Sequence, residues 1–270
     1  MKTTHLLYPS FLLAATPFAA FPQATPTHPN LVFIMADQFR GDALGCMQKE
    51  PVQTPNLDTL AVSSYPVSSP ARAMLMTGMY PTANGVTGNC NSQNTPYGVE
   101  LSSEAVCWSD VLKQAGYATA YIGKWHLDAP RLPYVDTYNN RGAVAWNEWC
   151  SPERRHGFEQ WTAYGTYDNH LKPMYWNTEA SREDFYYVDQ WGPSYEADRA
   201  IDFIRTESKQ SDHPFALVVS MNPPHTGYEL VPDSFKQRYA HLDVEALAAQ
   251  KPYIPPKGTP EGDYFRKHIR

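Results

Sequence analysis

The chain has 270 residues, enough to bury a substantial core in one large or two modest domains. Hydrophobic residues make up 42% of it and charged residues 19%, which is typical of a globular protein. The net charge of −6 offers no basic field for nucleic acid, which is not an expected partner, so an anionic substrate would have to be held by local charges.

The first 24 residues are expected to act as an export signal. Lys2 supplies a positive charge at the start, residues 6–20 are apolar and uncharged, and alanines suited to cleavage stand at positions 19, 20 and 24. This stretch is too short for a membrane span, and no other apolar run is long enough to cross a bilayer. We therefore expect an exported protein, periplasmic or secreted, with no membrane span.

Three apolar runs predict the strands of a parallel sheet. Asn30 to Ala36 (NLVFIMA) and Phe215 to Met221 (FALVVSM) are rich in strand-forming residues, and Tyr117 to Ile122 is a shorter run of the same kind. The first run is bounded by Pro29 and Asp37, which fits a strand buried on both faces. Because helical patterns separate the runs, we expect an α/β fold with helices on both faces of the sheet.

Two helices are predicted between these runs. Residues 102–115 begin with a serine suited to the N-cap and stop at Gly116, and a second helix begins at Ser194. The residues expected to face the core are Val106, Leu112 and Ala115 in the first helix and Ala197, Ile201 and Ile204 in the second.

The segment from Tyr134 to Trp191 is rich in aromatic residues and has no clear periodicity. Packing of this long excursion onto the sheet is the favoured interpretation. The alternative is an insertion that carries an aromatic wall on which sugars stack.

The four cysteines, at positions 46, 90, 107 and 150, are widely spaced. An oxidising compartment would permit a disulfide among them, but the pairing does not follow from the sequence. The chain has no Cys-x-x-Cys pair or Cys/His cluster of the kind that binds zinc. Buried thiols and one structural disulfide both remain open.

Polar residues follow each of the three predicted strands at the point where the strand ends. They are Asp37 and Gln38 after the first strand, Lys124 and His126 after the second, and Asn222 and His225 after the third. Because ligands of parallel α/β sheets bind beyond the carboxyl ends of the strands, we expect these side chains to gather at one edge.

The stretch that starts at Ser68 predicts an anion site at the beginning of a helix. Ser69 suits the N-cap and Pro70 the first turn, so Ser68 would lie at the positive end of the helix dipole. Arg72, one turn further, is placed to bind an oxygen atom on residue 68. With the lysine and histidine after the second strand, this pattern predicts a site for a tetrahedral anion.

The chain resembles the formylglycine-dependent sulfatases of the alkaline phosphatase-like superfamily, in their bacterial serine-type form. The signature of that family is Cys or Ser, any residue, Pro, any residue, Arg, four residues and then Thr-Gly, and residues 68–78 match it. Further matches, in the order of the family, are DQFRGDALG at 37–45, TPNLDTLA at 54–61, AGYATAYIGKWHL at 115–127 and NPPH at 222–225. The resemblance implies a mixed, mainly parallel sheet sandwiched between helices and the hydrolysis of sulfate esters of carbohydrates or aryl alcohols.

The same resemblance implies how the site would be completed. Ser68 would be oxidised to formylglycine by a radical-SAM maturase, and the hydrated aldehyde would attack sulfur. Asp37, Gln38 and residue 68 would bind a single calcium ion, for which oxygen ligands are suited.

The remaining residues of the site would handle the sulfate group and its protons. The resemblance implies that Arg72 fixes an oxygen on residue 68 and that Lys124 holds sulfate oxygens. It further implies that His126 assists the formylglycine hydroxyl and that His225 contacts sulfate and protonates the leaving oxygen.

The chain also departs from the family pattern. The connection around residues 61–65 is shorter than in relatives, as if a strand had been deleted there. The resemblance implies that residues 29–270 are the N-terminal portion of the catalytic domain, and we expect the later metal ligands and the small C-terminal domain of the family to be absent from them. A chain of this extent is expected to bind calcium poorly and to turn over little. The alternatives are a phosphate or phosphonate ester hydrolase of the same superfamily and an inactive fragment that binds sulfated glycans.

Overall fold

The computed structural model describes residues 28–39, 43–48, 65–210, 213–243, 246 and 257–263. The predicted export signal at 1–24 and the TPNLDTLA motif at 54–61 lie outside the described residues, as does most of the shortened connection at 61–65. None of the helices in the described part of the chain is both long and apolar enough to span a bilayer.

The described residues form a mixed, mainly parallel sheet of six strands in the order β1-β6-β2-β3-β4-β5. The strands are β1 (Leu31–Ala36), β2 (Ala118–Lys124), β3 (Gln160–Tyr164), β4 (Met174–Asn177), β5 (Tyr186–Tyr187) and β6 (Phe215–Met221). The first four strands in that order are parallel, whereas β4 runs antiparallel to β3 and β5 antiparallel to β4. This arrangement confirms the predicted fold class.

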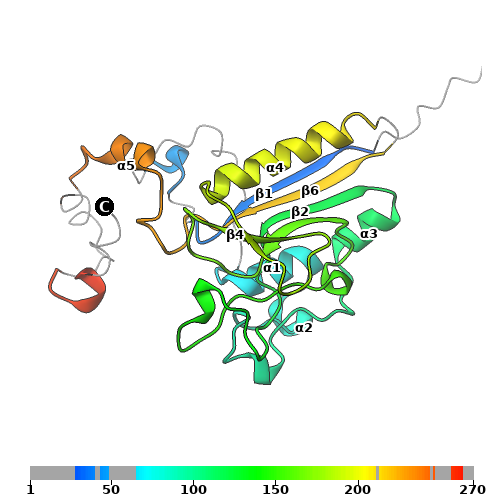
Figure 1. Ribbon diagram of the computed structural model, residues 1–270, viewed down its shortest axis with the longest axis horizontal. Coiled ribbons are helices and arrows are strands. Elements are labelled where there is room, and N and C mark those ends of the chain that lie inside the picture. The colour runs from blue at the N-terminus through cyan, green and yellow to red at the C-terminus, as the bar shows by residue number, and fades with distance from the viewer. Residues whose placement is uncertain are drawn as a thin grey trace, which may run out of the picture.

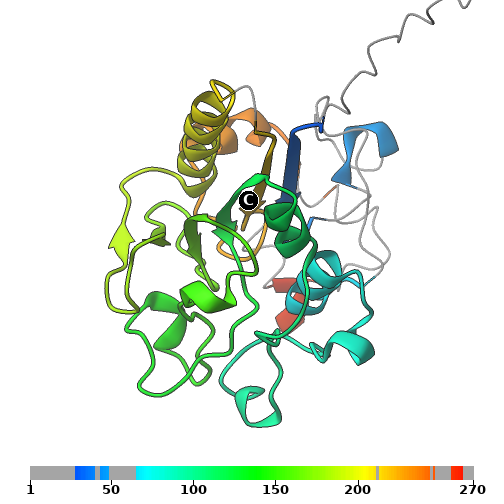
Figure 2. The ribbon, with the colours of Figure 1, turned by 90° about the vertical axis from the view of Figure 1, so that its right-hand side faces the viewer.

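Helices lie on both sides of the parallel strands (Figures 1 and 2). They are α1 (Ser68–Thr77), α2 (Pro81–Asn84), α3 (Trp108–Gln114), α4 (Gly192–Glu207) and α5 (Asp233–Tyr239), with short 3₁₀ turns at Gly45–Met47, Thr95–Tyr97, Tyr138–Asn140 and Pro152–Arg154. Because side chains alternate along a strand, Ile122 faces Phe203 of α4, while its neighbour Tyr121 packs with Met76 of α1 in a separate cluster.

Strand β1 is formed as predicted but is not buried as predicted. Residues Leu31 to Ile34 are 40–55% exposed, and β1 is an edge strand whose partner in the described sheet is β6. The apolar run predicts a strand correctly because that preference is local. Burial depends on a covering layer, which the described residues do not supply over β1.

Both predicted helices exist, with different starts or faces. Helix α3 begins at Trp108 after an N-cap at Cys107, and Ser102 instead accepts the backbone N–H of Glu104 in a preceding turn. In α4 the predicted face is right in part: Ile204 packs against the core cluster, whereas Ile201 is 43% exposed. The buried positions are Gly192, Pro193, Glu196, Ala200, Phe203 and Glu207. Two of these buried residues are glutamates. Because the prediction follows apolar residues only, it places the buried face one residue further along the helix.

The aromatic segment packs onto the sheet, as the favoured interpretation predicts. Strands β3, β4 and β5 arise from it, and Trp161, Tyr175 and Trp176 are buried. Its strands are too short for a clear alternation, which is why the sequence shows no periodicity there.

Three of the cysteines, Cys90, Cys107 and Cys150, are free thiols. Cys90, Cys107 and Cys150 are buried, and burial raises the pKa of Cys90 and of Cys107 to about 12. These thiols therefore remain protonated at neutral pH and behave as apolar core residues.

Candidate active site

Helix α1 brings Ser68 to the edge of the sheet where the parallel strands end. Ser68 is the first residue of α1, and the N-cap is Val67, so the prediction of Ser69 as the cap is wrong. Ser69 is fully buried and bonds across the fold instead. Its Oγ donates to the carbonyl oxygen of His126 at 2.7 Å and accepts from the backbone N–H of Cys90 at 3.0 Å. A buried carbonyl and a buried amide both need partners, and Ser69 supplies both.

The hydroxyl of Ser68 lies among side chains from three elements. It donates to Asp37 Oδ2, just beyond β1, at 3.1 Å. It lies 3.2 Å from Nδ1 of His126, which follows β2, and accepts from Nε of Arg72 in α1 at 3.2 Å. The structure thus brings together four residues that the sequence predicts for the site.

Two buried cations share the carboxylate of Asp37. Nζ of Lys124 contacts Asp37 Oδ2, and Nη2 of Arg72 lies 3.4 Å from the same oxygen. Burial alone would raise the pKa of Asp37, but the charges of Lys124 and Arg72 hold it far below its usual range. Burial lowers the pKa of Lys124, and the charge of Asp37 opposes that change. One carboxylate flanked by two cations leaves an excess of positive charge, which suits an anionic substrate.

The guanidinium of Arg72 is anchored to the ends of β2 and β6. Its Nη1 donates to the carbonyl oxygen of Lys124 and to Oγ of Ser220, both at 2.6 Å, and lies 3.4 Å from the hydroxyl of Tyr121. Its Nη2 is buried without a hydrogen-bond acceptor among the described residues. No sequence pattern marks Ser220 or Tyr121 as a partner of Arg72, although Ser220 is the one polar residue within its apolar strand.

His126 presents an unprotonated nitrogen to Ser68. Its Nε2 lies 3.1 Å from the carbonyl oxygen of Cys90, which can only accept, so Nε2 carries the proton and Nδ1 the lone pair. Burial and the charge of Lys124 keep the pKa of His126 well below its usual value, so the ring is neutral at neutral pH. The residue has φ of +53°, a conformation that side chains other than glycine rarely adopt.

The third strand end joins the cluster through Asn222. Its Oδ1 accepts from Nζ of Lys124 at 2.9 Å, and its Nδ2 donates to Oδ1 of Asp168 at 3.0 Å. The same Asp168 oxygen lies 3.0 Å from Nδ1 of His225, whose side chain is 23% exposed. His225 is therefore linked to the site through Asp168.

Gln38 is not brought into this network. It is exposed with φ of +59°, and no hydrogen bond joins it to these side chains in the described part of the chain. As donors for a calcium ion, Asp37, Gln38 and residue 68 have suitable oxygen chemistry, but calcium takes about six to eight oxygens. Each contact of the Asp37 carboxylate with a described residue uses Oδ2. These three residues therefore offer the oxygen ligands that calcium prefers, but they supply only part of its coordination shell.

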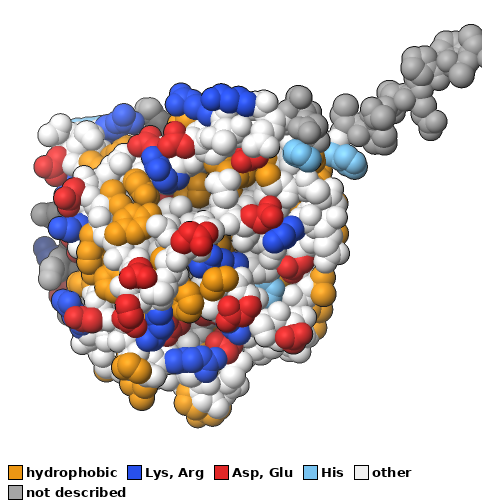
Figure 3. Space-filling view, turned by 45° about the vertical axis from the view of Figure 1, so that its right-hand side comes forward, with side chains coloured by type: hydrophobic (Ala, Val, Ile, Leu, Met, Phe, Trp, Pro, Cys, Tyr) orange, Lys and Arg blue, Asp and Glu red, His pale blue; other side chains and the backbone are white. Residues whose placement is uncertain are grey.

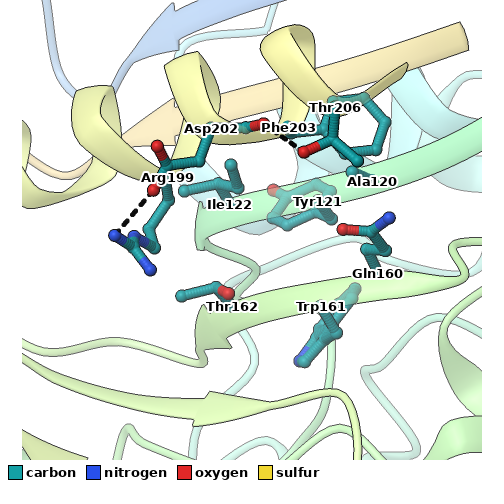
Figure 4. Close-up of a pocket in the computed structure, with 10 residues that line it drawn as sticks. All are labelled: Ala120, Tyr121, Ile122, Gln160, Trp161, Thr162, Arg199, Asp202, Phe203 and Thr206. Carbon is teal, nitrogen blue, oxygen red and sulfur yellow. Dashed lines mark hydrogen bonds and ion pairs between the residues drawn. The ribbon is translucent and has the colours of Figure 1, made fainter. Parts of the chain in front are cut away.

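A cavity elsewhere in the fold is separate from the candidate active site. It has a volume of about 220 Å³ and lies between α4 and strands β2 and β3, beside the Arg199–Asp202 ion pair (Figure 4). Its lining includes none of the residues predicted for the site.

The surface charge does not mark a second site on the face shown in Figure 3. Acidic and basic side chains are interspersed on that face and are not separated by sign.

One group of potential metal ligands lies apart from Ser68. Atoms of Cys107, Asp110 and His156 lie within 4.8 Å of one another. Cys107 and Asp110 form the capping box of α3, and Nδ1 of His156 lies 3.1 Å from the carbonyl oxygen of Ala105. That nitrogen therefore carries a proton, and the three side chains have structural roles.

The chain is similar to known sulfatases over most of its described length. The sulfatase family model matches residues 29–251. The endo-4-O-sulfatase of Bacteroides thetaiotaomicron is 37% identical over 241 residues, which cover 78% of this chain and 46% of that protein. The ulvan-active sulfatase of Formosa agariphila is 34% identical over 227 residues, covering 81% of this chain and 40% of that protein.

The fold is also similar to that of a solved sulfatase structure. The crystal structure of YidJ from Bacteroides fragilis, a protein assigned to the sulfatases, superimposes with a TM-score of 0.85 at 68% identity. The alignment covers 92% of this chain and 56% of that one, so the chain spans about half the length of the relatives it matches. With the family match across residues 29–251, this shows that the chain belongs to the sulfatase family of sulfuric ester hydrolases.

Proposed function

We propose that the protein releases inorganic sulfate from sulfated carbohydrates, with residue 68 as the nucleophile after its oxidation to formylglycine. The observation that carries this proposal is the position of the Ser68 hydroxyl, within 3.2 Å of Asp37, Arg72 and His126. The endo-4-O-sulfatase and ulvan-active sulfatase among its relatives support a sulfated glycan over a simple aryl sulfate. The apolar leader at 1–24 supports an exported location.

The oxidised side chain would supply a pair of hydroxyls on one carbon, one for attack on sulfur and one for the later release of sulfate. Oxidation of the Ser68 alcohol to the aldehyde removes two hydrogens, and we assign that step to a radical-SAM maturase. A calcium ion held by Asp37, Gln38 and residue 68 would neutralise the sulfate and lower the pKa of a bound hydroxyl.

The residues around position 68 have distinct tasks in this proposal. Arg72 fixes the oxygen of residue 68 through its Nε, and Lys124 binds sulfate oxygens, because each side chain carries a positive charge held in place by buried partners. His126 accepts the hydroxyl proton on its free Nδ1. His225 donates a proton to the ester oxygen as the S–O bond breaks.

The test uses the full-length gene product, co-expressed with a radical-SAM maturase. We expect the peptide that carries residue 68 to be lighter by two hydrogens than the encoded serine form. We also expect sulfate release from a sulfated oligosaccharide, abolished in Ser68→Ala. An active protein whose Ser68 remains unmodified would contradict the formylglycine mechanism.

Substrate class requires a second measurement. Sulfate and phosphate monoesters of the same alcohol differ only in the transferred group, so their kcat/KM values compare the two chemistries directly. We expect the sulfate ester to be preferred. A preference for the phosphate ester would instead support the alternative hydrolase of the same superfamily.

A further inference from the structure

Asp168 lies in direct contact with His225, the proposed acid of the reaction. Its Oδ1 lies 3.0 Å from Nδ1 of His225 and accepts from Nδ2 of Asn222 at 3.0 Å. Burial alone would raise the pKa of Asp168, but the hydrogen bond and charge of His225 hold it well below its usual range. Asp168 is therefore an ionised acceptor at neutral pH.

The carboxylate of Asp168 is itself held in place by Asn139. Nδ2 of Asn139 donates to Asp168 Oδ2 at 2.8 Å, and the backbone N–H of Asp168 donates to Oδ1 of Asn139 at 2.9 Å. The two bonds fix which end of the Asn139 amide faces the carboxylate, since the backbone N–H requires an oxygen. Both Asp168 oxygens therefore accept from oriented donors, and the carboxylate has little freedom to turn.

The loop that carries His225 is pinned to the same segment at two further points. His170 Nε2 lies 2.8 Å from the carbonyl oxygen of Thr226. Gly227 has φ of +88°, and a Cβ there would lie 2.8 Å from the carbonyl oxygen of Asp168. The loop thus approaches residues 168–170 closely and repeatedly, which places the His225 ring against the fixed carboxylate.

This geometry determines which nitrogen of His225 is available. A carboxylate can only accept, so Nδ1 of His225 carries a proton that it donates to Asp168. Nε2 then faces away from Asp168. In metal and catalytic sites, a partner of this kind sets the tautomer and orientation of the imidazole and stabilises its protonated form.

We propose that Asp168, clamped by Asn139, is a positioning residue that directs Nε2 of His225 to the leaving oxygen of the substrate. The inference rests on the proposed function for its chemical step. As the bond between sulfur and the ester oxygen breaks, a bond forms between sulfur and the oxygen of residue 68, whose hydroxyl proton passes to Nδ1 of His126. The Nε2 proton moves to the departing ester oxygen, so a neutral alcohol leaves and neutral His225 remains, to be reprotonated from water.

The kinetic test compares two leaving groups in the full-length, matured protein. In Asp168→Asn, we expect kcat/KM for a sulfated sugar to fall by about 10–100-fold, the usual loss when the partner of a functional histidine is removed. For 4-nitrophenyl sulfate we expect less than about a threefold change, because a nitrophenolate leaves without a proton. A purely structural role for Asp168 would lower both values equally, and that result would overturn the proposal.

Two further variants sharpen the comparison. Asn139→Ala removes the clamp but leaves the carboxylate, so we expect a smaller loss with the same dependence on leaving group. Asp136→Asn is the matched control, because Asp136 is an acid with an 80% exposed side chain that pairs with Arg141 and does not contact His225. We expect both substrates to be turned over at wild-type rates in this control.

A measurement independent of turnover tests the geometry alone. The imidazole ¹⁵N signals of His225, assigned by their loss in His225→Ala, report which ring nitrogen is protonated. In the neutral ring we expect the proton on Nδ1 in the wild type and a change toward the Nε2-protonated form in Asp168→Ala. An unchanged tautomer in Asp168→Ala would overturn the inference, whether or not the protein releases sulfate. A changed tautomer in a protein without sulfatase activity would uphold the geometry and refute the proposed function.

Discussion

Single side chains at the candidate site serve the fold and the chemistry together, and Ser69 is the clearest case. Next to the proposed nucleophile, it bonds the carbonyl oxygen of His126 and the backbone N–H of Cys90 through one hydroxyl. Since His126 itself faces Ser68, this hydroxyl sets the distance between α1 and the loop after β2. Local sequence suggests a helix cap for Ser69, whereas the tertiary contacts assign it a bridging role.

Substitution Ser69→Ala should therefore destabilise the protein. It leaves a buried N–H and a buried carbonyl without partners, which costs about 1–3 kcal/mol. We expect a lower urea midpoint with an unchanged slope. The matched control is Ser103→Ala, whose exposed hydroxyl bonds only the neighbouring Glu104 at 3.4 Å. Equal midpoints for the two variants would contradict the bridging role.

At the scale of elements, the site depends on how closely β2 and β6 approach. Gly123 pairs with Ser220 in the parallel register and has φ of +99°. A Cβ at Gly123 would lie 2.2 Å from the carbonyl oxygen of Ser220, closer than atoms can approach. Lys124 follows directly, so the lysine that contacts Asp37 owes its position to this close approach of the two strands.

Gly123→Ala should disrupt this part of the sheet. Gly116 provides a matched control, because its φ is +86° and a Cβ there would meet no atom within 4 Å. We expect Gly116→Ala to cost about 1–2 kcal/mol, from the backbone conformation alone. Gly123→Ala should cost more than about 4 kcal/mol, since the strands must also separate. Equal unfolding free energies in denaturant titrations would show that the contact with Ser220 is not restrictive.

At the scale of the whole molecule, a buried glutamate joins α4 to the sheet. Oε1 of Glu196 accepts from the hydroxyls of Tyr164 in β3 and Tyr175 in β4, at 3.3 and 3.1 Å. Its Oε2 has no partner among the described residues. Burial raises the pKa of Glu196 to about 7, although both tyrosine hydrogen bonds favour the ionised form.

Stability should therefore fall as the pH rises through the range between 4.5, the ordinary pKa of a glutamate, and about 7. In that window the folded state keeps the Glu196 proton and the unfolded state loses it, so unfolding is favoured by rising pH. The free energy of unfolding should be lower by about 3 kcal/mol at pH values above this window than at pH values below it.

Glu196→Gln should remove this contribution, because its side chain mimics the protonated acid. We expect its thermal midpoint to exceed that of the wild type at pH 8, and the two to converge at pH 4.5. Asp198→Asn, an exposed change on the same helix, should follow the wild type at every pH. Parallel pH profiles for wild type and Glu196→Gln would refute the role of this carboxyl.

The sequence by itself determined strands β1, β2 and β6 and the polar residues at their ends. β1, β2 and β6 lie where apolar runs predict them, and Asp37, Lys124 and Asn222 do meet at one edge. These features follow from local preference and from the rule that parallel strands end at the same edge.

Only the tertiary structure decided which partner each polar group would take. Asp168 meets His225, 57 positions away, because the chain returns to the sheet edge after β3 and again after β6. The buried face of α4 carries Glu196 because two tyrosine hydroxyls from the neighbouring strands lie there to bond it. A residue's own preference is local, whereas burial and hydrogen bonding depend on distant segments that sequence spacing does not specify.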